Sequence, residues 1–150
     1  MNVNRLPSED AAVLANIDPD AYAAGTYTSP YVSMEHWDSV MGIVQAGDFV
    51  ATGVLNASIK QATDGSGAGS KAITGKSITA LTAAGTDDNK QALINVNSDE
   101  LDVDNGFLFV ALQIVLTTAG ADAGGMLLGF NGRFGPANDN DSATVDEIVT

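Results

Sequence analysis

Hydrophobic and polar residues alternate along several short segments of the chain, with the period of two that marks half-buried β-strands. Between positions 54 and 62, Leu55, Ala57 and Ile59 share one face, and polar residues occupy most of the other. The same pattern predicts strands over 31–33, 39–45, 54–62, 90–97, 107–118 and 126–134. No segment has the length and the 3.6-residue period of a convincing amphipathic helix.

The segment 107–118 is the strongest predicted strand, because apolar residues dominate both of its faces. We therefore expect it to lie centrally in a sheet and to be covered on both sides. The glycine-rich stretch TDGSGAGS at 63–70 predicts a flexible surface loop. The segment 72–84 fits either a short helix or a loop that packs its apolar residues against the body.

Six or more strands of this kind, separated by turns, predict an all-β fold, a β-sandwich or jelly roll. Three prolines and one glycine interrupt the first thirty residues, where we expect only a short helix or strand over 11–15. The last residues of the chain, 137–150, are mostly acidic or polar, with a few apolar residues near the end. We expect extended arms on both sides of the domain: an N-terminal arm at 1–30, a β-sandwich at 31–136 and an acidic C-terminal arm at 137–150.

Composition and charge limit the classes of partner. With 150 residues, 45% of them hydrophobic and 17% charged, the chain is long and apolar enough for one folded domain. Its net charge is −13, and its six Lys and Arg residues are scattered. We therefore expect no direct binding to nucleic acid and none to an anionic membrane. The acidity fits either a solubility effect or a basic partner.

Cysteine is absent, so the chain has neither disulfides nor thiolate chemistry. The longest apolar run, about 107–116, is shorter than the roughly 20 residues of a membrane helix. The first residues also lack the basic and apolar regions of a secretory signal. From the sequence we expect a soluble protein made in the cytoplasm.

No motif indicates an enzyme, a cofactor or a metal. Gly75-Lys76-Ser77 resembles the end of a phosphate-binding loop, but Ser70 stands where the first glycine belongs. The acidic segment 102–106 places its glycine out of register for a calcium loop, although a cation held between subunits stays an alternative. His36 is the only histidine and has neither an identifiable nucleophile nor zinc ligands around it. We predict no catalytic, cofactor-binding or metal-binding residue.

Several stretches together resemble small proteins of tailed phages and prophages. They are IDPDAYAAGTYTS (17–29), DSVMGIVQAGDF (38–49), ASIKQATDGSGAGSKAITGKSITAL (57–81), SDELDVDNGFLFVALQI (98–114) and AGGMLLGFNGRFGPANDND (123–141). Within that group the chain is most similar to capsid decoration, or cement, proteins. Some of these are small jelly rolls that clamp neighbouring major capsid proteins. The resemblance implies a place on the capsid surface of the virion, manufacture in the host cytoplasm, and no catalytic residues.

The implied partners are the major capsid protein and further copies of the chain, as a dimer or trimer. The candidate interface residues are apolar or aromatic residues of the two arms and of the first strands. They are Leu6, Val13, Leu14, Tyr22, Tyr27, Tyr31, Trp37, Val145, Ile148 and Val149. For each of them, packing onto the domain's own sheet is the alternative.

Two other functions compete with decoration of the shell. A neck or tail component of the virion would use the same kind of fold in fewer copies. A carbohydrate- or receptor-binding jelly roll would need an exposed aromatic residue beside acids, and only the segment 35–38 offers one.

Overall fold

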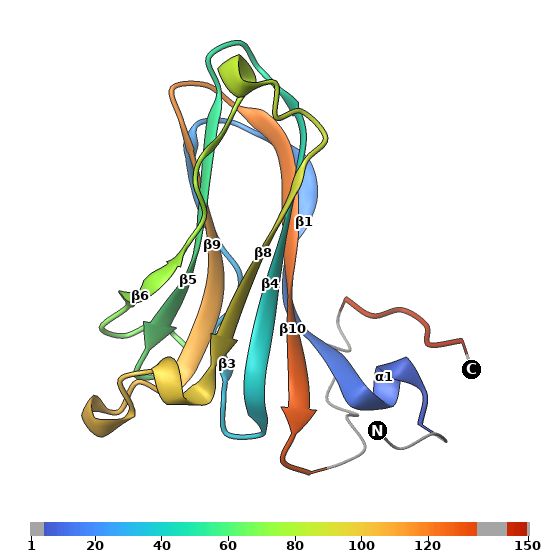
Figure 1. The fold of residues 1–150 in the computed structure, drawn as a ribbon, viewed down its shortest axis with the longest axis vertical. Helices are drawn as coiled ribbons and strands as arrows, with labels where there is room; N and C mark the ends of the chain where they lie inside the picture. The colour runs from blue at the N-terminus through green and yellow to red at the C-terminus, as the bar shows by residue number, and fades with distance from the viewer. Residues whose placement is uncertain (1–4, 135–143, 150) are drawn as a thin grey trace.

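The computed structural model describes residues 5–134 and 144–149, and they form two antiparallel β-sheets packed face to face (Figure 1). Sheet A contains, in spatial order, β1 (Ala11–Tyr22), β10 (Ala121–Gly132), β4 (Trp37–Phe49) and β8 (Gln91–Asn97). Sheet B contains β2 (Gly25–Thr28), β9 (Phe109–Thr117), β5 (Val54–Ala62) and β6 (Lys71–Ser77). The short β3 (Val32–Ser33) pairs with β9, and β7 (Leu81–Thr82) pairs with β5. Short helices complete the described chain: α1 (Pro7–Asp10), η1 (Ala83–Gly85), η2 (Ser98–Glu100) and η3 (Val103–Asn105).

The order of the strands makes this sandwich a jelly roll. The chain places its longer strands β1, β10, β4 and β8 in one sheet and β2, β9, β5 and β6 in the other. Two interlocked Greek keys over eight strands produce this arrangement. The predicted all-β jelly-roll class is confirmed.

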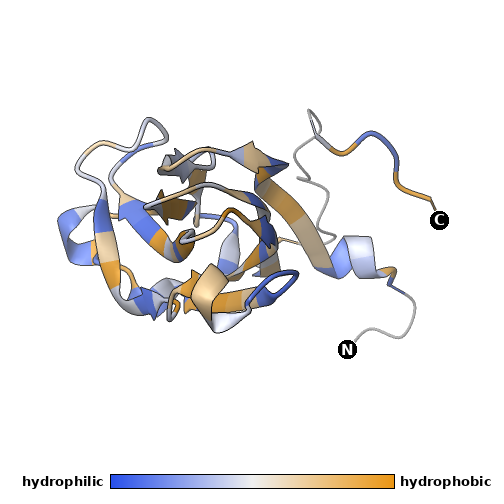
Figure 2. Cartoon of the chain, turned by 90° about the horizontal axis from the view of Figure 1, so that it is seen from above, coloured by the Kyte–Doolittle hydropathy of each residue, from blue (hydrophilic) through white to orange (hydrophobic). Residues whose placement is uncertain are grey.

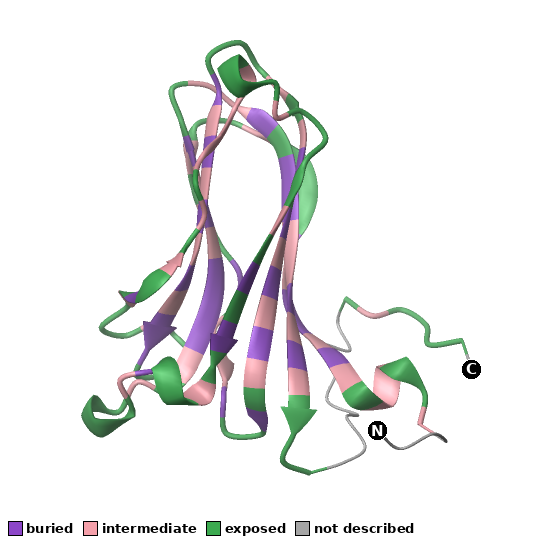
Figure 3. Cartoon of the chain, in the orientation of Figure 1, coloured by how far each residue is buried: buried purple, intermediate pink, exposed green. Residues whose placement is uncertain are grey.

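The core lies between the sheets and is almost entirely aliphatic. Strand β5 alternates as its sequence predicts, with Leu55 and Ile59 fully buried against Leu112 and Ile114 of β9 in the same core cluster. Figure 3 shows this alternation as bands of buried and half-buried residues along the strands. Gly125 lets the sheets approach, because a Cβ there would lie 2.7 Å from the Leu112 side chain.

The expected N-terminal arm at 1–30 is wrong for most of its length. Strand β1 pairs with β10 from Ala11 to Tyr22, and Leu14 and Ile17 are buried in the core. Pro19 is tolerated because β1 is an edge strand and its register shifts between Ile17 and Asp20. The sandwich therefore begins at Ala11 rather than at residue 31.

The glycine-rich segment at 63–70 is a surface turn, as predicted, and Asp64 closes it. The Oδ1 atom of Asp64 accepts hydrogen bonds from the backbone N–H groups of Ser66 and Ala68, at 2.9 and 3.0 Å. The Ala68 and Ser66 hydrogen bonds hold the pKa of Asp64 below its usual range. Gly67, at φ +84°, supplies the left-handed conformation that this turn needs.

Two further expectations change. The segment 72–84 is neither a helix nor a simple loop, because it contributes to β6, β7 and η1 along the edge of sheet B. The strand predicted over 107–118 is central, as expected, between β2 and β5. Its outward face is not fully covered, since Phe109, Gln113 and Val115 are half-buried.

Candidate interaction surface

Two of the candidate interface residues, Leu14 and Trp37, lie in the core. Both side chains fill the space beside Gly129. A Cβ added to this glycine would lie 2.6 Å from the Trp37 ring and 2.8 Å from the Leu14 side chain. Trp37 is only 4% exposed although its neighbours Glu35, His36 and Asp38 are exposed. The prediction that these two residues form an interface is wrong, because the domain itself buries them.

Tyr22 and Tyr27 brace the connection between β1 and β2. Their rings lie 4.2 Å apart, the Tyr22 hydroxyl donates to the Asp18 carbonyl at 2.6 Å, and the Tyr27 hydroxyl donates to the Ala23 carbonyl at 3.1 Å. Burial, followed by the charges of Asp18 and Asp20, raises the pKa of Tyr22. Both residues are half-buried, so a role in an interface stays a prediction.

Tyr31 holds the turn at 63–70 against the body. Its hydroxyl shares a hydrogen bond of 2.5 Å with the Ser70 hydroxyl. Its ring lies where a side chain on Gly67 would be, 2.6 Å from an added Cβ. Packing within the domain therefore accounts for the contacts of this aromatic residue in the described chain.

The terminal segments expose apolar side chains outside the sandwich. Leu6 is 43% exposed before α1, and Ile148 and Val149 are 48% and 84% exposed, while Val145 is half-buried. Charged side chains stabilise helix α1 locally. The Glu9 carboxylate accepts a hydrogen bond from the Leu6 N–H at 2.8 Å, and the Arg5 guanidinium lies 3.3 Å from the Asp10 carboxylate. Figures 1 and 2 show α1 and the segment 144–149 on the same side of the molecule, beyond the body of the sandwich.

A second apolar surface lies on the outside of sheet A, where strand register aligns outward side chains in rows. The rows are Ala11, Phe130, Ser39 and Asn97; Val13, Leu128, Met41 and Asn95; and Asn16, Met126, Ile43 and Leu93. We call these residues the outer face of sheet A. Leu93 is 57% exposed, and the large apolar residues of β4 and β10 in these rows are half-buried.

None of the residues in this face is charged, although the chain carries 19 acids. The outer face of sheet B is different, because polar residues such as Thr28, Gln113 and Ser58 align there and Lys60 adds a charge. The sequence analysis picked out only Val13 from the outer face of sheet A. The signal was present in β4, where Met41 and Ile43 alternate with the buried Val40 and Val44.

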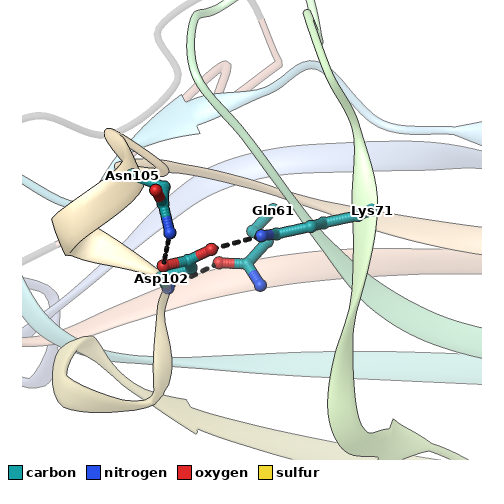
Figure 4. Close-up of polar contacts among 4 residues, drawn as sticks. All are labelled: Gln61, Lys71, Asp102 and Asn105. Atoms are coloured by element: carbon teal, nitrogen blue, oxygen red, sulfur yellow. Dashed lines mark hydrogen bonds and ion pairs between the residues drawn. The ribbon is translucent and has the colours of Figure 1, made fainter.

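Two lysines of β6 hold the acidic segment 98–106 to sheet B through ion pairs, and Figure 4 shows the pair formed by Lys71. Asp102 forms an ion pair with Lys71 and accepts a hydrogen bond from the Asn105 amide at 2.8 Å. The buried Gln61 side chain accepts from the Asp102 N–H at 2.9 Å. The Lys71 ammonium also lies 3.8 Å from the centre of the Phe107 ring.

A parallel ion pair joins Glu100 to Lys76 at 2.7 Å. Hydrogen bonds from the two lysine side chains are the main cause that lowers the pKa of Asp102 and of Glu100. Gly75-Lys76-Ser77 thus belongs to the edge strand β6, where Lys76 binds a carboxylate of the same domain. Within residues 5–134 and 144–149, no three His, Cys, Asp or Glu side chains are grouped so that they could hold a metal ion.

Trp37, the aromatic residue on which the sugar-binding alternative depends, is buried. Asp38 instead pairs with Arg133 at 3.0 Å, and the His36 ring meets Phe134 edge-on at 5.9 Å. Among the described helices, none has the length and apolar character required to cross a membrane.

Comparisons with known proteins return structural likenesses only. No protein family matches the sequence, and neither does any curated protein. A VP2 protein of infectious bursal disease virus, in derived T=1 particles, aligns over 80% of this chain at 14% identity with a TM-score of 0.46. The structure of the Gx strain of that virus aligns over 85% at 17% identity with a TM-score of 0.41. This chain spans 31% and 35% of those chains, and its fold assignment depends on its own strand order.

Proposed function

We propose that the chain is a capsid decoration, or cement, protein that binds the outside of a major capsid protein lattice and stabilises the head of a phage. The observation that carries this proposal is the exposure of Leu6, Ile148 and Val149 on segments that leave one side of a rigid jelly roll. Apolar side chains of this size gain free energy when a partner covers them. The sequence resemblance to small virion proteins supports the same function.

The physical role of such a protein is to favour the assembled lattice. A ligand that binds the assembled state and not the free subunits stabilises the assembly by mass action. A jelly roll is a suitable spacer, because its two sheets enclose one shared hydrophobic core. Many weak attachments over one shell add up, so no single contact has to be strong.

The test is attachment to particles of the parent virus from which the protein has been removed. We expect the full chain to co-sediment with these particles and to raise the temperature at which they rupture. The double variant Ile148→Asp and Val149→Asp should lose most of the attachment. Val50→Asp, at a side chain that is 59% exposed on the β4–β5 turn, is the matched control and should attach normally.

Attachment that survives the double variant unchanged would overturn the role of the C-terminal segment. Band intensities of intact particles separate decoration from the neck or tail alternative. A copy number close to that of the major capsid protein supports decoration, whereas a handful of copies selects a neck or tail component.

A further inference from the structure

We infer that two copies of this chain pair through the outer face of sheet A. The centre of this face is formed by Met41, Ile43, Met126 and Leu128 of the two central strands, aligned by the register of β4 with β10. Phe130 extends the apolar area at one end, and Leu93 extends it onto β8. These six side chains make one continuous apolar area across neighbouring strands.

The charge pattern selects the kind of partner. Burying a charged side chain without a counter-charge is unfavourable, so an uncharged face requires an uncharged partner surface. The outer face of sheet B does not meet this requirement, because Lys60 lies in it. The outer face of sheet A on a second copy does meet it.

The polar groups at the margins of the face also suit a copy of themselves. Asn95 and Asn97 on β8 carry amides, which contain both donors and acceptors, whereas the Asn16 amide on β1 donates to Asp18. An amide can therefore bond to the same amide across a two-fold axis, whereas a carboxylate or an ammonium group would repel its own copy. Such a contact is isologous, with the same patch used on both subunits.

The size of the face sets the strength of the contact. Four strands about 4.8 Å apart and six residues of about 3.3 Å rise give roughly 400 Å² in projection. A stable interface uses about 800 Å² from each partner, so we expect a weak dimer that forms at roughly 10 µM or above. Each copy also carries a net charge of −13, which opposes pairing and is screened by salt.

Analytical ultracentrifugation of the full chain tests this inference. The wild-type mass should rise from that of the 15.3 kDa monomer towards twice that value with concentration. The dimer should form more readily at about 1 M than at about 0.05 M NaCl, because the Debye length falls from above 10 Å to about 3 Å.

The decisive variants add a positive charge to the face. Ile43→Lys makes the chain less negative, so the overall repulsion between two copies would weaken. The association constant of the dimer should nevertheless fall at least tenfold, because the new charge lies in the pairing face. Leu93→Lys does the same at an exposed edge position, and it decides the question if Ile43→Lys does not fold. Val115→Lys on the outer face of sheet B and Val50→Lys on the β4–β5 turn are the matched controls and should pair as the wild type does.

A wild-type chain that stays monomeric at about 500 µM in high salt would overturn the inference. Equal pairing by Leu93→Lys and the wild type would overturn it as well, and so would an equal loss in the two controls. The outcome is independent of the proposed attachment to a capsid. The variant Ile148→Asp and Val149→Asp should still pair, and Leu93→Lys should still attach to particles.

Discussion

At the scale of the residue, Gly129 determines where Trp37 can lie. The space that a side chain would occupy at Gly129 is filled by the Trp37 ring and by Leu14. This contact explains why a tryptophan flanked by charged residues is buried rather than exposed. The sequence offers no local signal for it, because Gly129 and Trp37 are far apart in the chain and meet only through the pairing of β4 with β10.

Replacing Gly129 tests this packing. We expect Gly129→Ala to reduce the free energy of unfolding by about 1–3 kcal/mol, because the added methyl group must displace a ring and a leucine held in the core. Urea unfolding followed by tryptophan fluorescence measures the change. The control is Gly65→Ala, whose Cβ would lie 3.7 Å from Phe109, an ordinary contact. A Gly129→Ala protein as stable as the control would contradict the role given to this glycine.

At the scale of the element, alternation predicts strands well but not the side that each strand presents to the core. In β10 the large residues Met126, Leu128 and Phe130 share a face, which in isolation is the pattern of a core face. The structure turns them outward and points Gly125, Leu127 and Gly129 inward. Glycines are required at these inward positions because the side chains of Leu112 and Trp37, from other strands, occupy the space beside them. The sequence of β10 alone does not contain this information.

Edge strands are harder to recognise than central ones for a related reason. Strand β5 is buried on one face by the whole sandwich, so its sequence alternates clearly, and the central strand β9 is apolar on both faces. Strand β1 contains Pro19 and a register shift, and its sequence alone favours an irregular arm. An edge strand tolerates this proline, because its backbone does not need to donate a hydrogen bond there. Of the predicted interface residues, Leu6, Ile148 and Val149 are exposed, whereas Leu14 and Trp37 belong to the core.

The segment 98–106 makes stability depend on pH. The pKa of Glu100 is lowered, first by the hydrogen bond from Lys76 and then by that from the Asn97 N–H. A carboxyl group whose pKa is lower in the folded state than in the unfolded state stabilises the fold above the unfolded pKa, and that contribution is lost as the pH falls through the folded pKa.

The variant Lys76→Met isolates this contribution. We expect it to be less stable than the wild type at about pH 7, with a gap in the free energy of unfolding that narrows as the pH falls through the lowered pKa of Glu100, because the protonated carboxyl no longer pairs with Lys76. Urea midpoints over this pH range measure the effect. Lys71→Met is a useful comparison, because Lys71 also packs on the Phe107 ring and part of its effect should remain in acid. A gap for Lys76→Met that does not change with pH would show that the ion pair is not its cause.

At the scale of the whole molecule, the jelly roll separates two kinds of surface. The uncharged outer face of sheet A is built on four hydrogen-bonded strands that are backed by the core. The exposed apolar residues at the two ends of the described chain lie instead on short segments outside the sandwich. A face fixed by strand pairing suits a symmetric contact between copies, and terminal segments suit attachment to a different surface.

The boundary of the domain follows from β1. Removing residues 1–10 takes away α1 but leaves every strand in place, so we expect the shortened protein to unfold at nearly the wild-type temperature. Removing residues 1–22 deletes an edge strand that supplies Leu14 and Ile17 to the core, and it exposes the backbone of β10 as a new edge. We expect that protein to aggregate or to lose its cooperative transition, because the core would be open along one side. Circular dichroism melts and size-exclusion chromatography distinguish the two, and a cooperatively folded monomer lacking residues 1–22 would show that β1 is an arm after all.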